Sequence, residues 1–176
     1  IIIKTSSKSK LIADQNTIIG NTVLYGATSG KLYASGQAGE RFAVRNSGSF
    51  AIVEGCGAHG CEYMTGGNAI ILGAVGDNFG AGMTGGMAFV YDEKNEFENF
   101  ANPASIIWQS VETDYWKKFL KESIKDFESK TSSQKAKKIL ENFEDELKNF
   151  KQVCPIEMLD KLDNPISLKP HVKKAG

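Results

Sequence analysis

Short apolar runs alternate with glycine-containing segments between residues 20 and 92. The segment Met-Thr-Gly-Gly at 64–67 recurs at 83–86, and the shorter relatives Asn46-Ser47-Gly48 and Thr28-Ser29-Gly30 precede it. Four glycines therefore fall at intervals of 18, 19 and 19 residues. They are Gly30, Gly48, Gly67 and Gly86, with Gly55 and Gly73 closing two of the apolar runs that follow.

A period near 19 with one apolar run in each period predicts a solenoid. Runs of about five residues are too short for helices and suit strands. A second set of strands is expected before the glycines, at 22–25, 41–44 and 61–64. Stacked short strands joined at tight corners predict a right-handed parallel β-helix with about 19 residues per turn. Glycine is expected at the corners because it adopts positive φ without a Cβ clash.

Stacking the repeats on their glycines predicts two columns of side chains inside the coil. One column holds Leu32, Phe50, Ala69 and Ala88, and the other holds Ala34, Ile52, Ile71 and Val90. The opposite face of the same strands is also apolar, with Tyr33, Ala51, Ile70 and Phe89. A sheet that is apolar on both faces is covered on both faces, so we expect the C-terminal helices to pack on the outside.

The period changes to a helical one after residue 113. Apolar residues from Trp116 to Phe127, and again from Ala136 to Phe150, recur at helical spacing and predict an antiparallel pair of helices. Ser132 and Ser133 separate the two and can cap the second helix, and Pro155 ends it or starts a short third one. The predicted organisation is a β-helix over 1–95, a connecting loop over 96–110, packed helices over 111–163 and an irregular tail over 164–176.

Composition narrows the functional class. Lysine and arginine number 21 and balance 21 aspartate and glutamate residues, so no basic field points to nucleic acid. Three cysteines, no signal peptide and no long apolar span predict a cytoplasmic protein with no membrane partner. The chain opens on Ile1-Ile2-Ile3 without methionine, which suggests a piece of a longer polypeptide. Another copy or another domain is expected to cover this strand edge.

Two segments, 55–60 and 80–85, match the pattern Gly-x-Gly-x-x-Gly. A dinucleotide site needs this pattern between a strand and a helix, whereas both segments run into strand-like residues, so corners are the preferred interpretation. Cys56, His59 and Cys61 provide only three close ligands where a structural zinc site uses four. A Cys/His nucleophile pair would also need an orienting third group.

Carboxylates give no clear catalytic pattern either. Glu54, Glu62 and Asp77 could form an acidic strip, but their spacing does not stack them in one column. His171 stands alone in the polar tail and is expected at the surface. The residues predict a scaffold with no catalytic, cofactor-binding or metal-binding residue.

Several long strings resemble one family. They are Ile18–Thr22, Leu24–Thr28, Ala38–Gly48, Val53–Gly55, His59–Gly67 and Asn78–Gly86. They are similar to the C-terminal GXGXG domain of the glutamate synthase large (alpha) subunit, and the resemblance is dense over 1–95. Ala58 departs from the family, in which an acidic residue often precedes this histidine.

The resemblance implies a parent enzyme that makes glutamate from 2-oxoglutarate and glutamine. Such an enzyme uses FMN, an iron–sulfur cluster and electrons from NADPH or ferredoxin, and its catalytic domains lie outside this chain. The resemblance also implies that this β-helix is non-catalytic and holds the catalytic domains together. Its expected partners are other glutamate synthase domains or subunits, or a second copy at the open N-terminal edge.

Two other functions stay open. One is the related GXGXG subunit of formylmethanofuran dehydrogenase, which would make the chain an interaction component of a molybdenum or tungsten enzyme. The other is a free-standing catalytic β-helix, which would require an acidic groove and activity in the isolated chain.

Overall fold

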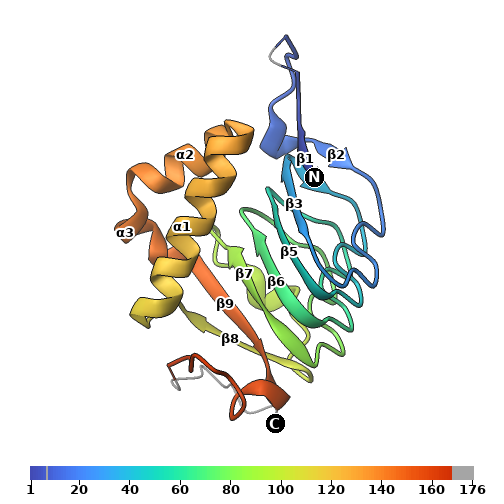
Figure 1. Ribbon diagram of the computed structural model, residues 1–176, viewed down its shortest axis with the longest axis vertical. Helices are drawn as coiled ribbons and strands as arrows, with labels where there is room; N and C mark the ends of the chain where they lie inside the picture. Colours follow the sequence, from blue (N-terminus) through green and yellow to red (C-terminus); the bar gives the residue numbers. More distant parts are fainter. Residues whose placement is uncertain (7, 168–176) are drawn as a thin grey trace.

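A computed structural model describes residues 1–6 and 8–167. Its main feature is a seven-stranded sheet in the order β1-β3-β5-β6-β7-β9-β8 (Figure 1). The strands are β1 (Ile2–Lys4), β3 (Lys31–Ser35), β5 (Ser47–Val53), β6 (Thr65–Ile71), β7 (Gly85–Tyr91), β8 (Ile106–Ser110) and β9 (Phe150–Pro155). The first five pair in parallel, one from each successive coil, which confirms the predicted parallel solenoid.

A second, smaller side of the coil carries β2 (Thr17–Ile19) and β4 (Gln37–Ala38), which also pair in parallel. The 3-10 helix η1 (Ala13–Gln15) precedes β2. Bridges such as Ala38 with Cys56 continue this side into the next coil.

The predicted stacking of side chains is wrong at one coil. Leu32 pairs with Ala51 and Ala34 pairs with Val53, so Phe50 and Ile52 lie on the outer face. Phe50 pairs with Lys31 and with Asn68, the residues that follow Gly30 and Gly67. The residue aligned with these two glycines is therefore Ser49 and not Gly48, as the hydrogen bond from Phe50 N to Gly30 O also indicates. A one-residue shift moves a strand's side chains to the opposite face.

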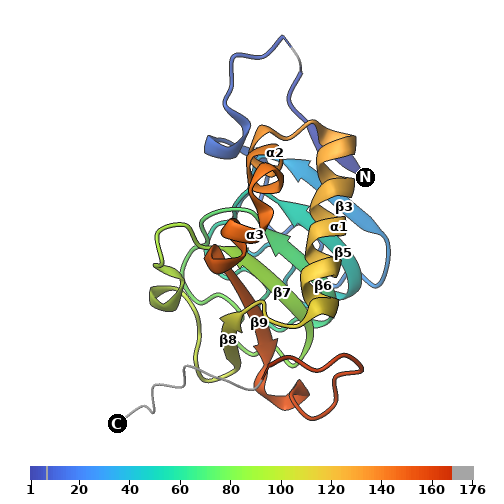
Figure 2. The ribbon, with the colours of Figure 1, turned by 90° about the vertical axis from the view of Figure 1, so that its left-hand side faces the viewer.

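Two apolar cores lie on either side of the sheet. The inner core fills the coil, and its corrected column of Ala51, Ala69 and Ala88 is fully buried. The outer core joins the other face of the strands to the helices, through residues such as Ile70, Phe89 and Phe127. Figure 2 shows α1 (Asp114–Thr131) lying across this outer face, as predicted.

The third side of the coil differs from the prediction. Residues 21–26, 41–45 and 58–63 form turns and not strands. Positive φ recurs at every second residue, for example at Arg41, Ala43 and Arg45, and the same alternation occurs in the neighbouring coils. Short apolar segments suggested strands here, but in the turn of residues 41–45 the three central residues, Phe42, Ala43 and Val44, are all buried.

The C-terminal region is a helical pair only in part. α2 (Gln134–Glu141) follows α1 and is capped by Ser133, as predicted. The predicted continuation of this helix to Phe150 is wrong, because α3 (Phe143–Glu146) and the 3-10 helix η3 (Leu147–Asn149) intervene before β9.

Strands β8 and β9 were not predicted. β9 pairs antiparallel with both β7 and β8, so the last parallel coil is followed by a hairpin-like pair from distant parts of the chain. The remaining 3-10 helices are η2 (Phe97–Asn99), within the predicted connecting loop over 96–110, and η4 (Ile156–Met158), after Pro155. In the described residues no helix is both long and apolar enough to cross a membrane.

Candidate functional site

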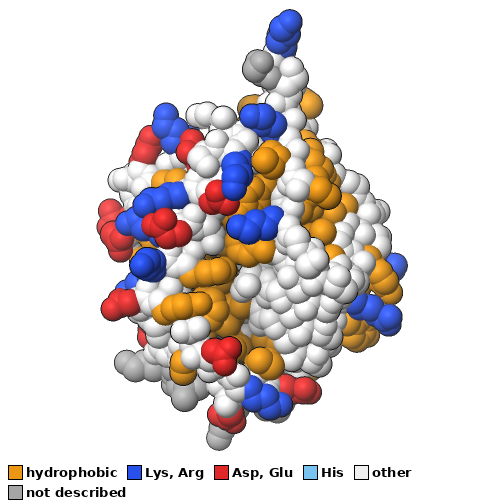
Figure 3. Space-filling view, viewed as in Figure 1, with side chains coloured by type: hydrophobic (Ala, Val, Ile, Leu, Met, Phe, Trp, Pro, Cys, Tyr) orange, Lys and Arg blue, Asp and Glu red, His pale blue; other side chains and the backbone are white. Residues whose placement is uncertain are grey.

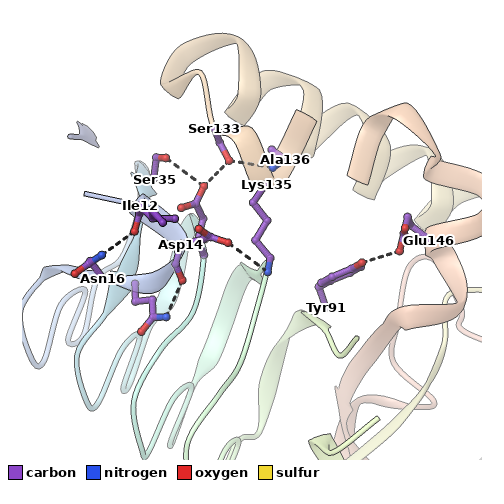
Figure 4. A network of polar contacts seen from close by, with 11 residues as sticks. Ile12, Asp14, Asn16, Ser35, Tyr91, Ser133, Lys135, Ala136 and Glu146 are labelled. Atoms are coloured by element: carbon purple, nitrogen blue, oxygen red, sulfur yellow. Dashed lines mark hydrogen bonds and ion pairs between the residues drawn. The ribbon is translucent and has the colours of Figure 1, made fainter. Parts of the chain in front are cut away.

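A polar junction connects the coil to the start of α2. Glu54, the residue directly after β5, is only 2% exposed. Its Oε1 atom accepts a hydrogen bond from the Ser35 hydroxyl at 3.1 Å and another from the Ser133 hydroxyl (Figure 4). Its Oε2 atom is buried and has no hydrogen-bond partner among the described residues. The junction therefore uses one carboxylate oxygen to hold the coil and the helix together.

A cavity of about 380 Å³ borders this junction and is lined by Asp14, Glu54, Tyr91 and Lys135, among others. Lys135 Nζ lies 4.0 Å from Asp14 Oδ2 and 5.6 Å from the centre of the Tyr91 ring. The Tyr91 hydroxyl donates a hydrogen bond of 2.6 Å to Glu146 (Figure 4). The polar groups of the cavity therefore come from the coil, from η1 and from α2.

Burial raises the pKa of the Glu54 carboxyl group, because the charged form loses hydration. The hydrogen bonds from Ser133 and Ser35 act in the opposite direction and stabilise the carboxylate. Both hydroxyl groups donate to Oε1, so Oε2 is the atom that can bind a proton at the cavity. Among the described residues no cysteine or histidine lines this cavity, so the arrangement is suited to structural pairing more than to nucleophilic chemistry.

The structure brings Cys56 and Cys61 into the interior of the coil. Burial raises the pKa of the Cys56 thiol to about 12 and that of Cys61 well above its usual value. Thiols of this kind are poor nucleophiles and poor metal ligands. His59 lies outside them and faces Glu62, with 3.2 Å between Nδ1 and Oε1. Across residues 1–6 and 8–167, no group of three metal-binding side chains is present.

The three carboxylates considered as an acidic strip are not brought together. Glu54 lies beneath α2, whereas Glu62 pairs with His59 on the turn side of the coil. Asp77 is exposed there and contributes its backbone carbonyl, which accepts a hydrogen bond of 2.7 Å from His59 N. His171 lies outside the described residues.

The glycines fall into distinct columns. Gly30, Gly67 and Gly86 have φ values of 91°, 79° and 79°. Gly48, Gly66 and Gly85 form the neighbouring column, where a Cβ atom would lie 2.1–2.3 Å from a carbonyl oxygen of the preceding coil. Gly55 and Gly73 follow the strands without positive φ. The segment 55–60 follows β5 and leads into a turn, the segment 80–85 leads from a turn into β7, and neither opens a helix.

Sequence reasoning missed two features. One is the hydrogen bond of 2.5 Å from the Tyr33 hydroxyl to Asp126 Oδ2, which joins the coil to α1 across 93 residues. The other is the row of left-handed turns that carries Arg41 and Arg45. A sequence signal for this row of turns was available, because Arg41 and Arg45 are the only arginines in the chain.

Comparison with known proteins identifies the family. The model of the family described as "GXGXG motif" matches residues 1–156. The chain is 54% identical over 168 residues to the glutamate synthase [NADPH] large chain of Azospirillum brasilense, covering 96% of this chain and 11% of the relative. It is 48% identical to the ferredoxin-dependent glutamate synthase of Antithamnion sp., covering 88% of the chain and 10% of the relative.

A third relative is the glutamate synthase [NADH] of Schizosaccharomyces pombe, 45% identical over 99% of this chain and 8% of its own length. The chain thus spans about a tenth of the length of the curated relatives that it matches. The chain therefore belongs to the GXGXG motif family, in the form found in glutamate synthase large chains.

Proposed function

We propose that this chain is a non-catalytic structural domain of an enzyme that makes glutamate from glutamine and 2-oxoglutarate. The carrying observation is that relatives named for NADPH, NADH and ferredoxin match this chain at 45–54% identity. A domain that recognised the electron donor would be expected to differ among these enzymes. Its similarity across all three supports a role that does not depend on the donor.

The contacts of the candidate residues support the same role. Glu54 accepts hydrogen bonds that tie the coil to α2, and His59 pairs with Glu62. Cys56 and Cys61 are buried inside the coil. Each of these groups is therefore either hydrogen-bonded within the chain or packed in its core.

The catalytic cofactors of such an enzyme are FMN, an iron–sulfur cluster and a source of electrons, and we assign them to other parts of the parent polypeptide. In this proposal the chain contributes a rigid coil between catalytic domains of a cytoplasmic enzyme. The edge strand β1 offers one contact surface, because Ile1 and Ile2 are 79% and 51% exposed. The relatives reported above are all glutamate synthases, which favours this role over a subunit of formylmethanofuran dehydrogenase.

The test uses the full-length polypeptide that carries this domain, assayed for glutamine-dependent glutamate formation with each electron donor. Glu54→Gln, His59→Ala and Cys61→Ala should each leave kcat/KM within about twofold of the wild-type value, because no transition-state contact is removed. A fall of about 100-fold in kcat with an unchanged melting temperature would assign a catalytic residue to this domain and overturn the proposal.

A further inference from the structure

The two arginines of the chain lie in the same turn of the coil. Arg41 and Arg45 are both exposed, and their φ values are 59° and 55°. Between them, Phe42 and Ala43 are fully buried in the inner core. This turn therefore holds both guanidinium-bearing residues on the outer side of the coil. Figure 3 shows basic and hydrophobic side chains together at its right-hand edge, where Figure 1 places the turns.

The adjacent coils place aromatic residues beside these arginines. Tyr63 is the residue of the next coil that corresponds to Arg45, and Tyr25 lies in the preceding coil. Both tyrosines are 54% exposed. The Arg45 guanidinium lies 5.8 Å from the centre of the Tyr25 ring. We call the surface formed by Tyr25, Arg41, Arg45, His59 and Tyr63 the arginine face.

The arginines of this face have no ionic partner within the described part of the chain. None of the ion pairs among those residues involves an arginine. Two carboxylates lie in the same turns: Glu40, which is exposed, and Glu62, whose carboxylate faces His59 at 3.2 Å. The guanidinium groups therefore keep their donors available for an external acceptor.

The backbone beneath the arginine face is held in place by hydrogen bonds between coils. Arg41 N donates to Ala58 O at 2.8 Å, and Arg45 N donates to Glu62 O at 2.9 Å. Left-handed backbone at a non-glycine residue is strained and persists only where surrounding contacts fix it. A fixed platform lowers the entropy lost when a partner binds.

We propose that the arginine face docks an acidic segment of the parent polypeptide, with carboxylates of that segment bound by Arg41 and Arg45 and apolar atoms packed on Tyr25 and Tyr63. Guanidinium groups bind carboxylates in a two-point geometry, and arginine and tyrosine are enriched at protein interfaces. The relatives contain about nine-tenths of their length outside the matched part, which supplies such a segment. The net charge of zero disfavours nucleic acid as the occupant.

This inference rests on the proposed structural role and adds the surface through which it acts. The test is nitration of tyrosines in the native full-length polypeptide with tetranitromethane, read by mass spectrometry. Each tyrosine is referred to its own rate after unfolding in urea. Tyr115, 50% exposed on α1, serves as an internal comparison. The variants are Arg41→Glu/Arg45→Glu and a matched control, Lys137→Glu/Lys138→Glu, which reverses two exposed charges on α2.

In the wild-type protein and the lysine control, Tyr25 and Tyr63 should react about tenfold more slowly than after unfolding, as expected of residues covered by an interface. In Arg41→Glu/Arg45→Glu they should regain roughly half of the unfolded rate, in line with their exposure of 54%. The rate of Tyr115 should be the same in all three proteins.

Three results would overturn the inference. Wild-type Tyr25 and Tyr63 reacting at about half of the unfolded rate would mean that nothing covers the surface. Equal protection in wild type and in Arg41→Glu/Arg45→Glu would mean that the partner is not bound through carboxylates. Protection lost on dilution, or on nuclease treatment, would assign the surface to a second copy or to nucleic acid. Glutamate formation is measured separately, so failure of the proposed function is distinguished from failure of this inference.

Discussion

Ser133 donates a hydrogen bond to the carboxylate of Glu54, which lies 79 residues earlier in the chain. The same hydroxyl oxygen accepts a hydrogen bond of 3.0 Å from Ala136 N and so caps α2. One small side chain thus fixes both the start of the helix and its position on the coil. The stability of this contact depends on the protonation of a buried carboxyl group.

Glu54→Gln should make folding stability less dependent on pH. Burial raises the folded-state pKa of Glu54 above its unfolded value of about 4.3, so its contribution is fully present below that pH and is lost as the pH rises through the folded pKa. Each unit of increase corresponds to about 1.4 kcal/mol. Glutamine keeps an oxygen that accepts from Ser35 and Ser133. Urea unfolding at pH 4 and pH 8 measures the difference.

The control for this substitution is Glu54→Leu, which removes the acceptor. It should lower the free energy of unfolding at both pH values, by about 1–3 kcal/mol for each buried hydroxyl left without a partner. A wild-type protein that became more stable relative to Glu54→Gln between pH 4 and pH 8 would contradict the assigned direction of the pKa.

Gly85→Ala should destabilise the coil by several kcal/mol, since the new Cβ atom would lie 2.1 Å from the Thr65 carbonyl oxygen. Gly66→Ala should behave similarly, with 2.3 Å to the Ser47 carbonyl oxygen. Gly20 is the matched control, because no atom lies within 4 Å of its Cβ position. Gly20→Ala should be neutral or stabilising by about 0.5 kcal/mol. Thermal melts followed by circular dichroism compare the three, and equal midpoints would refute the close packing of the glycine column.

Ile71→Asp should prevent cooperative folding, because Ile71 is fully buried in the inner core and a lone carboxylate there is neither hydrated nor paired. Ile156→Asp makes the same chemical change at a residue that is 42% exposed and should cost less than about 1 kcal/mol. Denaturant unfolding of both variants checks this. A cooperative transition of Ile71→Asp close to that of Ile156→Asp would mean that Ile71 does not face the interior.

Thr22→Gly should stabilise the protein slightly, by about 0.5–1 kcal/mol, since a β-branched residue at φ 63° is strained and glycine is not. The gain is smaller than the strain because glycine also increases the entropy of the unfolded chain. Thr17→Gly, at an exposed position in β2, should instead cost about 0.5–1 kcal/mol. Urea unfolding that shows a higher free energy of unfolding for Thr22→Gly and a lower one for Thr17→Gly would establish the left-handed turn. A lower free energy of unfolding for both variants would argue against it.

The sequence repeat was enough to predict the parallel coil, because a period of 18–19 residues is visible in glycines and apolar runs alike. It was not enough to place Phe50. The motif Asn46-Ser47-Gly48 carries one glycine, whereas the later coils have the pairs Gly66-Gly67 and Gly85-Gly86. Gly48 was aligned with the second glycine of each pair, but it corresponds to the first. The buried side chain of Asn46, which bonds Ser49 N and Ser49 O, is specific to this coil.

Other differences arise from information that local pattern does not hold. Phe150 continues the helical spacing of Phe143 and Leu147, yet it begins β9 because its strand partners in β7 and β8 are remote in sequence. Glu54 was considered as part of an acidic strip, and its actual partner, Ser133, was predicted only as a helix cap. Such pairings between distant residues depend on how the helices pack against the coil.

The position of β9 between β7 and β8 has a consequence for synthesis on the ribosome. Within the part of the chain that the structure describes, β8 bonds to no strand other than β9, which is made about forty residues later. Until Phe150 leaves the exit tunnel, the nascent chain therefore carries a free strand and the unprotected edge of β7. During the interval of translation between these two segments, this domain is therefore exposed to mispairing with other chains.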